Sequence, residues 1–477
     1  MASVVVIGAG FAGHIAALYL GDELGKKHEI TVINKFDYFG YVPSWVWVGV
    51  GTMEADKTTF PLEPVYRKKR VNFVHGAATE VHPDEQFVVA EPADGSEPKR
   101  LDYDYLIIAT GPKLDFAATP GLGPDGGYSY SICTKDHALH ARDAYLESVA
   151  KLEKGEPQTM VIGTGHPAAT CQGAAFEYIT NIHKDLLRRG LRGKTKLIWL
   201  SNEQAVGDFG VRGIQVKRKS ELVTSEEFIS ALFKEYDIEW HIQRGVTKVD
   251  PGVIHWEDFA GEAGTTDFDF AMLIPKFAGV SMKYIGADGA DVSDKVVNAG
   301  GLVLVDAVYG LPYDELARSP EAWPGRYQNR AYPNVFAAGI AFAPPGPISK
   351  PHVNPNGLSI SAAPPRTGMV SGIIGRLVAK NVAQMITKGR MTHTESMADM
   401  PAACIASMGD SLWDGSAATI IMYPVVPDPI RYPNEDGRDL FVAHMEMGLS
   451  GAWMKRMLHT TFIYKLKARP GWKIIPE

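Results

Sequence analysis

The feature that most constrains this chain is a glycine-rich turn directly after its first apolar run. Residues 2–7 (ASVVVI) are continuously apolar, which is typical of a strand buried on both faces. The motif Gly8-Ala9-Gly10-Phe11-Ala12-Gly13 comes next, followed by a helical pattern over 14–24 and a strand-like run over 29–34. A strand, a GxGxxG turn, a helix and a strand in this order predict a Rossmann-like unit whose helix N-terminus accepts a pyrophosphate.

The glycines of this turn have separate tasks. The first makes the tight turn, the second lets backbone N–H groups approach a pyrophosphate, and the third permits close helix–strand packing. The second strand ends at Asn34 and Lys35, where such folds usually place an acid for the ribose, although an asparagine can still hydrogen-bond a hydroxyl. We therefore expect a dinucleotide to contact Gly8, Gly10, Phe11, Ala12, Gly13, Asn34 and Lys35.

Two later segments favour a flavin dinucleotide. A predicted strand over 103–108 ends in Ala109-Thr110-Gly111, a pattern found where the chain of a two-domain flavoprotein leaves its FAD domain. Residues 332–340 end in Ala338-Gly339-Ile340, where most such proteins have an Asp that holds the ribityl chain. With the N-terminal turn, these segments predict FAD as the cofactor, contacted also by Ala77, Ala109, Thr110, Gly111, Gly339 and Ile340.

A second glycine-rich turn follows a predicted strand over 158–162, and its chemistry differs. It reads Gly163-Thr164-Gly165-His166-Pro167-Ala168, and Pro167 removes a backbone N–H from the position that should hold phosphate. Cys171 comes next, early in a predicted helix, where the helix N-terminus lowers the pKa of a thiol and favours the thiolate. We therefore expect a reactive cysteine in place of a pyridine-nucleotide site.

The length and composition are those of a multidomain α/β enzyme. We expect two Rossmann-like domains of the glutathione-reductase-like flavoprotein class, the FAD domain over 1–115 and 300–390 and a second one over 116–299, plus a C-terminal region over 391–477. The formal charge of −7 gives no reason to expect a nucleic-acid partner. Three widely spaced cysteines predict no structural metal, and neither a signal peptide nor an 18-residue apolar run is visible.

The C-terminal region combines basic and bulky apolar side chains. Residues 450–473 hold no acid, and their basic residues are Lys455, Arg456, Lys465, Lys467, Arg469 and Lys473. Trp453, Met457 and Phe462 are among the apolar residues between them. This pattern predicts a helix in a membrane interface, and the alternative is a helix that packs on the protein and exposes a solvated basic face.

Several segments together resemble the sulfide:quinone oxidoreductase family over nearly the whole chain. The segment after the second strand, Tyr38-Phe39-Gly40-Tyr41-Val42-Pro43-Ser44, is similar to the family's. Asn34 falls where the family often has a small polar residue, and Ala337-Ala338-Gly339-Ile340 resembles its AAG followed by an apolar residue. Residues 363–368 (APPRTG) resemble its Pro-Lys-Thr-Gly segment, with Arg366 in the Lys place, and 404–410 (CIASMGD) resemble its C-terminal cysteine motif.

The resemblance implies an activity and a set of residues. Cys171 and Cys404 would form a redox pair beside FAD, sulfide would be oxidised to sulfur or polysulfide, and a membrane quinone would be the co-substrate. Cys133 matches a third family cysteine, while Glu177 and, more weakly, His137 resemble acid/base candidates. Arg366 would contact the cofactor, and Tyr41 and Tyr423 are suggested for the quinone. The implied localisation is peripheral, on a prokaryotic-type inner membrane through the C-terminal region, with self-association left open.

Three alternatives stay open at this point. The flavoprotein subunit of a flavocytochrome c sulfide dehydrogenase would pass electrons to haem, but no export signal is visible and the C-terminus is basic and apolar. A type II NADH:quinone oxidoreductase has the same fold, but the second glycine turn and Cys171 argue against it. A non-catalytic flavin-binding or redox-signalling protein would leave three cysteines in matching contexts unexplained.

Overall fold

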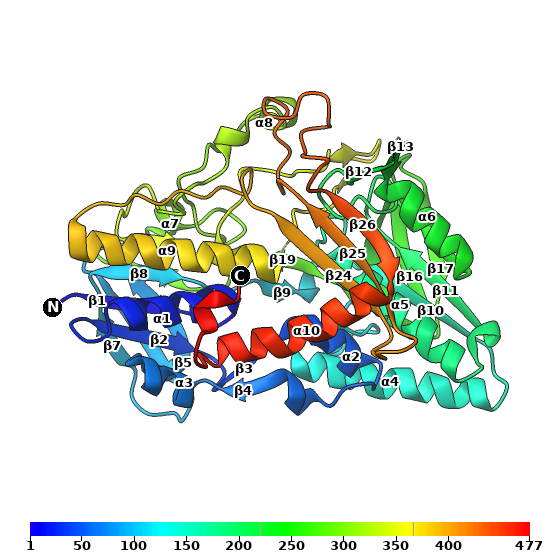
Figure 1. Ribbon diagram of the computed structural model, residues 1–477, viewed down its shortest axis with the longest axis horizontal. Helices are drawn as coiled ribbons and strands as arrows, with labels where there is room; N and C mark the ends of the chain where they lie inside the picture. Colours follow the sequence, from blue (N-terminus) through cyan, green and yellow to red (C-terminus); the bar gives the residue numbers. More distant parts are fainter. Residues whose placement is uncertain (220, 366) are drawn as a thin grey trace.

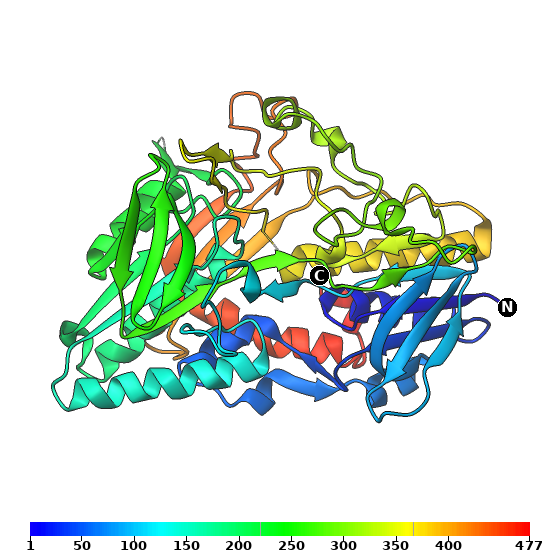
Figure 2. The same cartoon turned by 180° about the vertical axis from the view of Figure 1, so that it is seen from behind.

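The computed structural model describes residues 1–219, 221–365 and 367–477. Two sheets with flanking helices lie side by side, and a smaller sheet with one long helix bridges them (Figures 1 and 2). The first sheet has the strand order β21-β8-β1-β2-β5-β6-β7, parallel from β21 to β5. Its strands are β1 (Ser3–Ile7), β2 (Glu29–Asn34), β5 (Asn72–His82), β6 (Phe87–Pro92), β7 (Lys99–Asp102), β8 (Tyr105–Ile108) and β21 (Val335–Ala337).

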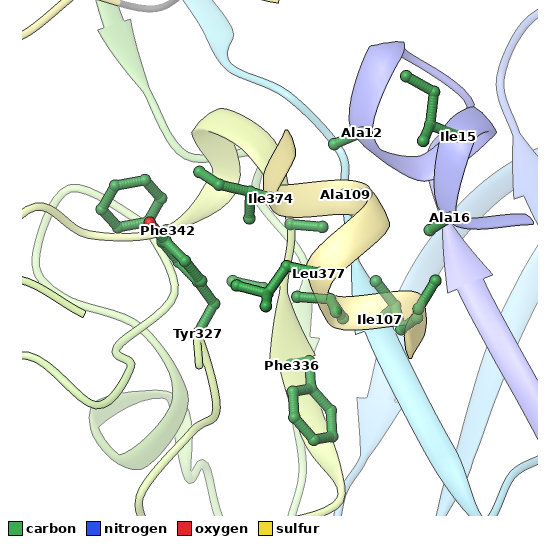
Figure 3. Close-up of a cluster of buried hydrophobic side chains, with 14 of the residues drawn as sticks. Ala12, Ile15, Ala16, Ile107, Ala109, Tyr327, Phe336, Phe342, Ile374 and Leu377 are labelled. Atoms are coloured by element: carbon green, nitrogen blue, oxygen red, sulfur yellow. The ribbon is translucent and has the colours of Figure 1, made fainter. Parts of the chain in front are cut away.

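Two helices pack closely on this sheet, α1 (Phe11–Glu23) and α9 (Gly368–Lys388). The close approach depends on Gly375, where a Cβ would lie 2.3 Å from the carbonyl oxygen of Ala12. Side chains of α1 and α9 meet over Ile107 and Ala109, and Phe336 continues the cluster along β21 (Figure 3). The FAD domain predicted from the first glycine turn therefore has a continuous core that joins residues distant in sequence.

The second sheet has the parallel order β14-β11-β10-β18. Its strands are β10 (Gln158–Thr164), β11 (Thr195–Leu200), β14 (Ile238–His241) and β18 (Phe270–Ile274). Helices α4 (Lys135–Glu153), α5 (Gln172–Arg188) and α6 (Ser225–Glu235) accompany it. A separate antiparallel sheet consists of β15 (Arg244–Asp250), β16 (Val253–Asp258) and β17 (Ala263–Asp267).

The chain returns to the first sheet earlier than the sequence indicated. β19 (Lys276–Ala278) pairs with β9 (Lys113–Asp115), so the two crossings between the sheets lie side by side. β20 (Lys283–Tyr284) then pairs with β5 of the first sheet. The predicted boundary at residue 299 therefore lies after the point where the chain returns. The return was missed because no apolar run marks it in the sequence.

The C-terminal layer is an antiparallel sheet of β24 (Ala402–Met408), β25 (Ser416–Met422) and β26 (His444–Gly448), followed by α10 (Leu449–Leu466). α10 runs from this sheet back to the first domain, where the Leu466 carbonyl accepts a hydrogen bond from His14 at 2.7 Å. Lys465 is fully buried there and pairs with Glu477 at 3.0 Å. This layer is therefore part of the protein's core rather than an appendage.

Short elements complete the described chain. The strands are β3 (Tyr38–Gly40), β4 (Thr59–Pro61), β12 (Gln215–Arg218), β13 (Glu221–Thr224), β22 (His352–Val353) and β23 (Ser359–Ile360). The helices are α2 (Trp45–Gly49), α3 (Glu63–Lys69), α7 (Ser293–Val296) and α8 (Tyr313–Leu316). α2 packs on α4 and α5, so the segment after β3 reaches from the first sheet to the second.

The contact between α1 and α9 gives a first prediction. Gly375→Ala should lower the free energy of unfolding by about 1–3 kcal/mol, because the added Cβ meets the Ala12 carbonyl and forces the helices apart. Gly193→Ala is the control, since a Cβ there would meet nothing within 4 Å. Urea unfolding of both variants measures the difference, and equal stabilities would show that the two helices can separate at no cost.

Candidate active site

The first glycine turn has the geometry that a dinucleotide requires. Gly8 has a φ of +100°, and a Cβ there would lie 2.3 Å from the Ala109 carbonyl oxygen. A Cβ on Gly13 would lie 2.0 Å from the Gly8 carbonyl oxygen. At Gly10, which caps α1, a Cβ would meet nothing within 4 Å, so this face of the turn is open. Because the first N–H groups of a helix have no partner within it, the turn fits a pyrophosphate.

Asn34 holds this turn in place. Its Oδ1 accepts from the Ala9 N–H at 2.9 Å, and its Nδ2 donates to the Phe36 carbonyl at 2.7 Å. An aspartate could make the first bond but not the second, which explains the departure from the usual acid. Each end of the amide keeps a second hydrogen-bonding position, so contact of Asn34 with the ribose stays a prediction.

The other predicted cofactor residues divide into two groups. Gly339 has a φ of +65°, and a Cβ there would lie 2.6 Å from the Ala12 side chain, so the 339–341 turn that includes Ile340 abuts the start of α1. Phe11, Ala109, Thr110 and Gly111 also lie in or beside the first turn. Ala77 instead lies within β5 opposite Glu91, and Lys35 is exposed at the end of β2. Arg366 lies outside the described residues.

The structure brings Cys404 to the start of the helix that Cys171 caps. Cys171 is the N-cap of α5, with a φ of +63°, a left-handed conformation that is uncommon outside glycine and concentrates at functional sites. Cys404 lies on β24, and its Sγ would be 3.2 Å from a Cβ on Gly173. A glycine in the first turn of α5 therefore makes room for the Cys404 thiol.

A buried carboxylate lies behind the cysteines. Glu177 accepts hydrogen bonds from the Ser407 N–H at 3.0 Å and from its hydroxyl at 2.6 Å. Its second oxygen accepts from Lys455 of α10 at 2.9 Å, and both partners of this ion pair are about 8% exposed. Glu177 is thus not a surface residue. Lys455 was missed as a site residue, because in the sequence it is one of six basic residues.

These charges act on the Cys404 thiol. The pKa of Cys404 is raised to about 11, mainly by burial and also by the Glu177 carboxylate, while the Lys455 ammonium acts in the opposite direction. Cys404 is therefore a protonated thiol at neutral pH. A second thiol, Cys133, lies just before α4, where burial raises its pKa to about 11 and its N–H donates to the Ser131 hydroxyl at 3.2 Å.

His137 lies apart from this cluster. It is in the first turn of α4, with its ring 5.6 Å from that of Phe116 and its Nε2 3.9 Å from Asp125. Burial lowers the pKa of His137, which keeps the ring neutral at pH 7. Among the described residues, none of these contacts joins it to Cys404 or Glu177, so the structure does not bring His137 and Glu177 together.

The second glycine turn is covered by another segment of the chain. Residues 165–171 separate β10 from α5, so the helix starts far later after its strand than α1 does. Backbone N–H groups of Ser361 and Ala363 donate to the carbonyls of Pro167 (2.9 Å) and Ala169 (3.1 Å). The Thr170 hydroxyl donates to the Pro364 carbonyl at 2.8 Å. The segment 361–364 is thus bonded to residues 167–170, which follow the second glycine turn.

The two polar side chains that follow β11, Asn202 and Glu203, are buried. In Rossmann-like units an acid at this position contacts a ribose. Here Asn202 donates to the carbonyls of Pro167 and Ala169, and Glu203 accepts from the Ser201 hydroxyl at 2.7 Å and the Phe209 N–H at 2.8 Å. The pKa of Glu203 is raised to about 8, mainly by burial and also by the Asp208 carboxylate. Both polar side chains are hydrogen-bonded within the protein, so neither is available to a ribose hydroxyl.

The two tyrosines suggested for quinone lie apart. Tyr41 is buried, with its ring 5.7 Å from that of Phe11 and 5.7 Å from that of His459 on α10. Tyr423 follows β25 at the end of the sheet where Ile421 pairs with His444, whereas α10 begins beside Ala417 at the other end. Its hydroxyl accepts from Arg431 at 3.1 Å. The structure therefore places Tyr41, but not Tyr423, beside α10.

Two of the basic residues in the C-terminal region are buried and others stay exposed. Lys455 and Lys465 are buried in ion pairs with Glu177 and Glu477, and the half-exposed Lys473 pairs with Asp22 at 3.0 Å. Lys467 lies over the Phe60 ring, and the exposed Arg469 lies over the Tyr464 ring. Lys455 and Lys465 therefore cannot contact a membrane surface, and the interface itself stays a prediction.

Comparison with known proteins defines the class first. The family described as pyridine nucleotide-disulphide oxidoreductase matches residues 2–254, which includes both glycine turns. The chain therefore belongs to this family. Its covered second turn and its two apposed cysteines distinguish it from a member that binds a pyridine nucleotide there.

Within this family, the relatives are more specific. The chain is 30% identical to "Sulfide-quinone reductase" of Aquifex aeolicus (strain VF5) over 91% of its own length and 86% of that protein, which places it in the sulfide-quinone reductase family. The crystal structure of the sulfide:quinone oxidoreductase from that bacterium superposes with a TM-score of 0.76 at 28% identity, over 98% of this chain and 92% of the other. A type II NADH:quinone oxidoreductase of Staphylococcus aureus is 27% identical over 34% of this chain and 39% of its own length.

The buried ion pair predicts how Cys404 reacts. Alkylation of Cys404 by iodoacetamide should be slow at pH 7 and accelerate toward pH 11. The double substitution Glu177→Gln with Lys455→Met should lower the thiol pKa, because the carboxylate acts on it more strongly than the ammonium, and it leaves no lone buried charge. Mass-spectrometric alkylation rates measure this, with the exposed Glu226→Gln as control. An unchanged rate profile in the double variant would show that Glu177 does not act on Cys404.

Proposed function

We propose that this chain oxidises sulfide and reduces a membrane quinone, with FAD as its cofactor. The observation that carries the proposal is the position of Cys404 at the start of the helix capped by Cys171, beside a second nucleotide turn that residues 361–364 cover. The redox centre thus replaces the nucleotide site. We assign the FAD domain to 1–115 and 300–390, together with the segment from β20 to residue 299 that returns to the first sheet. The second domain is then the rest of 116–299, and the quinone-side region is 391–477.

FAD held at the first glycine turn would supply the two-electron chemistry that links the cysteines to quinone. HS⁻ attacks a Cys171–Cys404 disulfide, leaving a persulfide on one cysteine and a thiolate, which takes up a proton, on the other. A second HS⁻ removes the sulfur as HSS⁻ and leaves two thiols. Their reoxidation to the disulfide releases two protons and two electrons, for which FAD would be the acceptor. We assign Glu177 to accept the proton of Cys404, since its carboxylate acts on that thiol.

Two features support this function over NADH oxidation. Residues 361–364 occupy the second turn through backbone hydrogen bonds, and Asn202 and Glu203 are both engaged within the protein. NADH would have to displace this segment before its pyrophosphate reached the turn. The partial likeness to type II NADH:quinone oxidoreductases is therefore assigned to the shared fold and to quinone as acceptor.

We also propose that a lipid surface is a partner, through the hairpin between β24 and β25. Trp413 at its tip is 90% exposed, and Leu412 beside it is about half exposed. The hairpin is held by ion pairs of Asp414 with Lys184 (3.2 Å) and of Asp410 with Arg188 (3.3 Å). Trp453 and Met457 of α10 add exposed apolar area on the same side. In the described chain, no helix is long and apolar enough to cross a membrane.

The cysteine pair gives the direct test of the chemistry. Cys171→Ser and Cys404→Ser should each lower sulfide-dependent quinone reduction at least roughly a hundredfold while the flavin absorbance is retained, because sulfur transfer needs both thiols. Cys133→Ser is the matched thiol control and should keep turnover, since no contact in the described chain joins it to Cys404. Full activity of either Cys171→Ser or Cys404→Ser would exclude the mechanism.

The hairpin gives a test of the lipid partner. Trp413→Ser should weaken binding to liposomes roughly tenfold or more, because an interfacial tryptophan contributes one of the largest apolar areas. Phe441→Ser is the matched control, since Phe441 is 97% exposed but lies in the β25–β26 connection at the opposite end of the sheet. Flotation on liposomes measures both. If only Phe441→Ser weakened binding, the membrane face would lie at the other end of the molecule.

A further inference from the structure

The backbone at Cys171 has a conformation that its neighbours must maintain. Residues 165–171 connect β10 to α5, and Cys171 ends this connection with a φ of +63°. A residue other than glycine keeps such a left-handed conformation only where the surrounding structure holds its backbone. The side chains that hold this connection therefore set the position of the Cys171 thiol.

Gln172, the residue after Cys171, is one of these side chains. It is 1% exposed, and its Nε2 donates to the Ala169 carbonyl at 3.3 Å and to Asn202 Oδ1 at 3.0 Å. The first bond closes a loop with only Thr170 and Cys171 between its ends. The Gln172 Oε1 has no hydrogen-bond partner in the described chain, so a substitution of this side chain removes just these two bonds.

Asn202, just after β11, extends the contact to the rest of the connection. Its Nδ2 donates to the carbonyls of Pro167 at 3.0 Å and Ala169 at 3.1 Å, and its N–H donates to the Thr164 hydroxyl at 3.1 Å. An ionised aspartate has no side-chain hydrogen to donate and would face these carbonyl oxygens with a carboxylate. The connection therefore requires an amide where other Rossmann-like units place an acid for ribose.

We propose that Gln172 and Asn202, the amide pair, are positioning residues that hold Cys171 in the conformation from which its thiol bonds to Cys404. The pair acts on the backbone and not on sulfur. Cys404 is held separately on β24, and its Sγ meets α5 at Gly173. This inference rests on the proposed function, because it names the residues that prepare that function's cysteine pair.

The amide pair should stabilise the disulfide relative to the two thiols. A disulfide restricts the separation and orientation of its two cysteines, whereas a free Cys171 can relax once the pair is lost. Loss of one hydrogen bond changes such an equilibrium by a factor of about three to ten. The equilibrium constant for disulfide formation should fall by this factor, which corresponds to a midpoint potential about 15–30 mV higher.

A redox titration of the FAD-loaded full chain measures this equilibrium. The protein is equilibrated anaerobically with mixtures of glutathione and glutathione disulfide, in which the two thiols become a disulfide and one glutathione disulfide becomes two glutathiones. Acid quenching, unfolding and alkylation then let mass spectrometry count the free thiols at Cys171 and Cys404. Gln172→Met, which keeps the side-chain length, and Asn202→Asp, which keeps its shape, should each lower the equilibrium constant roughly three- to tenfold.

Gln158→Met is the matched control. Gln158 is also buried, and its Nε2 donates to the carbonyl of the preceding residue at 2.9 Å, but it lies at the opposite end of β10 from the connection. Its disulfide equilibrium should equal that of the unsubstituted protein. Retained flavin absorbance shows that a variant is folded, and if Asn202→Asp loses it, Gln172→Met alone decides.

The outcomes separate this inference from the proposed function. An equilibrium that Gln172→Met leaves unchanged, or that Gln158→Met shifts as far, would overturn the positioning role. If the unsubstituted protein forms no disulfide between Cys171 and Cys404 in any mixture, the redox pair of the proposed function itself fails.

Discussion

One buried carboxylate connects the parts of this molecule that the chemistry requires. Glu177 lies on α5, whose N-cap is Cys171, and it accepts hydrogen bonds from Ser407 on β24, the strand that carries Cys404. Its other oxygen pairs with Lys455 on α10. Removing either charge would leave the other buried without a partner, which is strongly destabilising. The Ser407 hydrogen bonds therefore join the helix of Cys171 to the strand of Cys404, and the ion pair joins α10 to that helix.

The two glycine turns show how one local motif supports different chemistry. In the first, α1 begins immediately after the turn, and the open side of Gly10 leaves the helix N-terminus accessible. In the second, a longer connection delays α5, and residues 361–364 bond to the turn's carbonyls. In the proposed function, the cysteine at the start of α5 takes the place of a bound nucleotide. Both the bonded segment 361–364 and the later start of α5 separate the second turn from the first.

Glycine turns and single residues within them could be predicted from short sequence patterns. Buried side-chain contacts and strand pairing depend on the tertiary fold and could not. The first turn, the departure at Pro167 and the cysteine at 171 could be predicted because each depends on a few adjacent residues, whereas Cys404 was indicated only by the resemblance to a family. Lys455 could not be distinguished from Lys467, since only the fold shows that one meets a buried carboxylate and the other an aromatic ring. That Tyr41 and Tyr423 lie apart could not be predicted, because strand register is not visible in their sequence neighbours. The return at β20 was missed because a two-residue strand leaves no pattern.

The central claim is that a thiol pair has replaced the pyridine-nucleotide site. The most direct measurement is the flavin absorbance of the FAD-loaded protein under anaerobic conditions, titrated with sulfide in one cuvette and with NADH in another. The account predicts that sulfide bleaches the flavin and that NADH leaves it oxidised, because residues 361–364 cover the second turn. Bleaching by NADH and none by sulfide would contradict it and would make the cysteines structural.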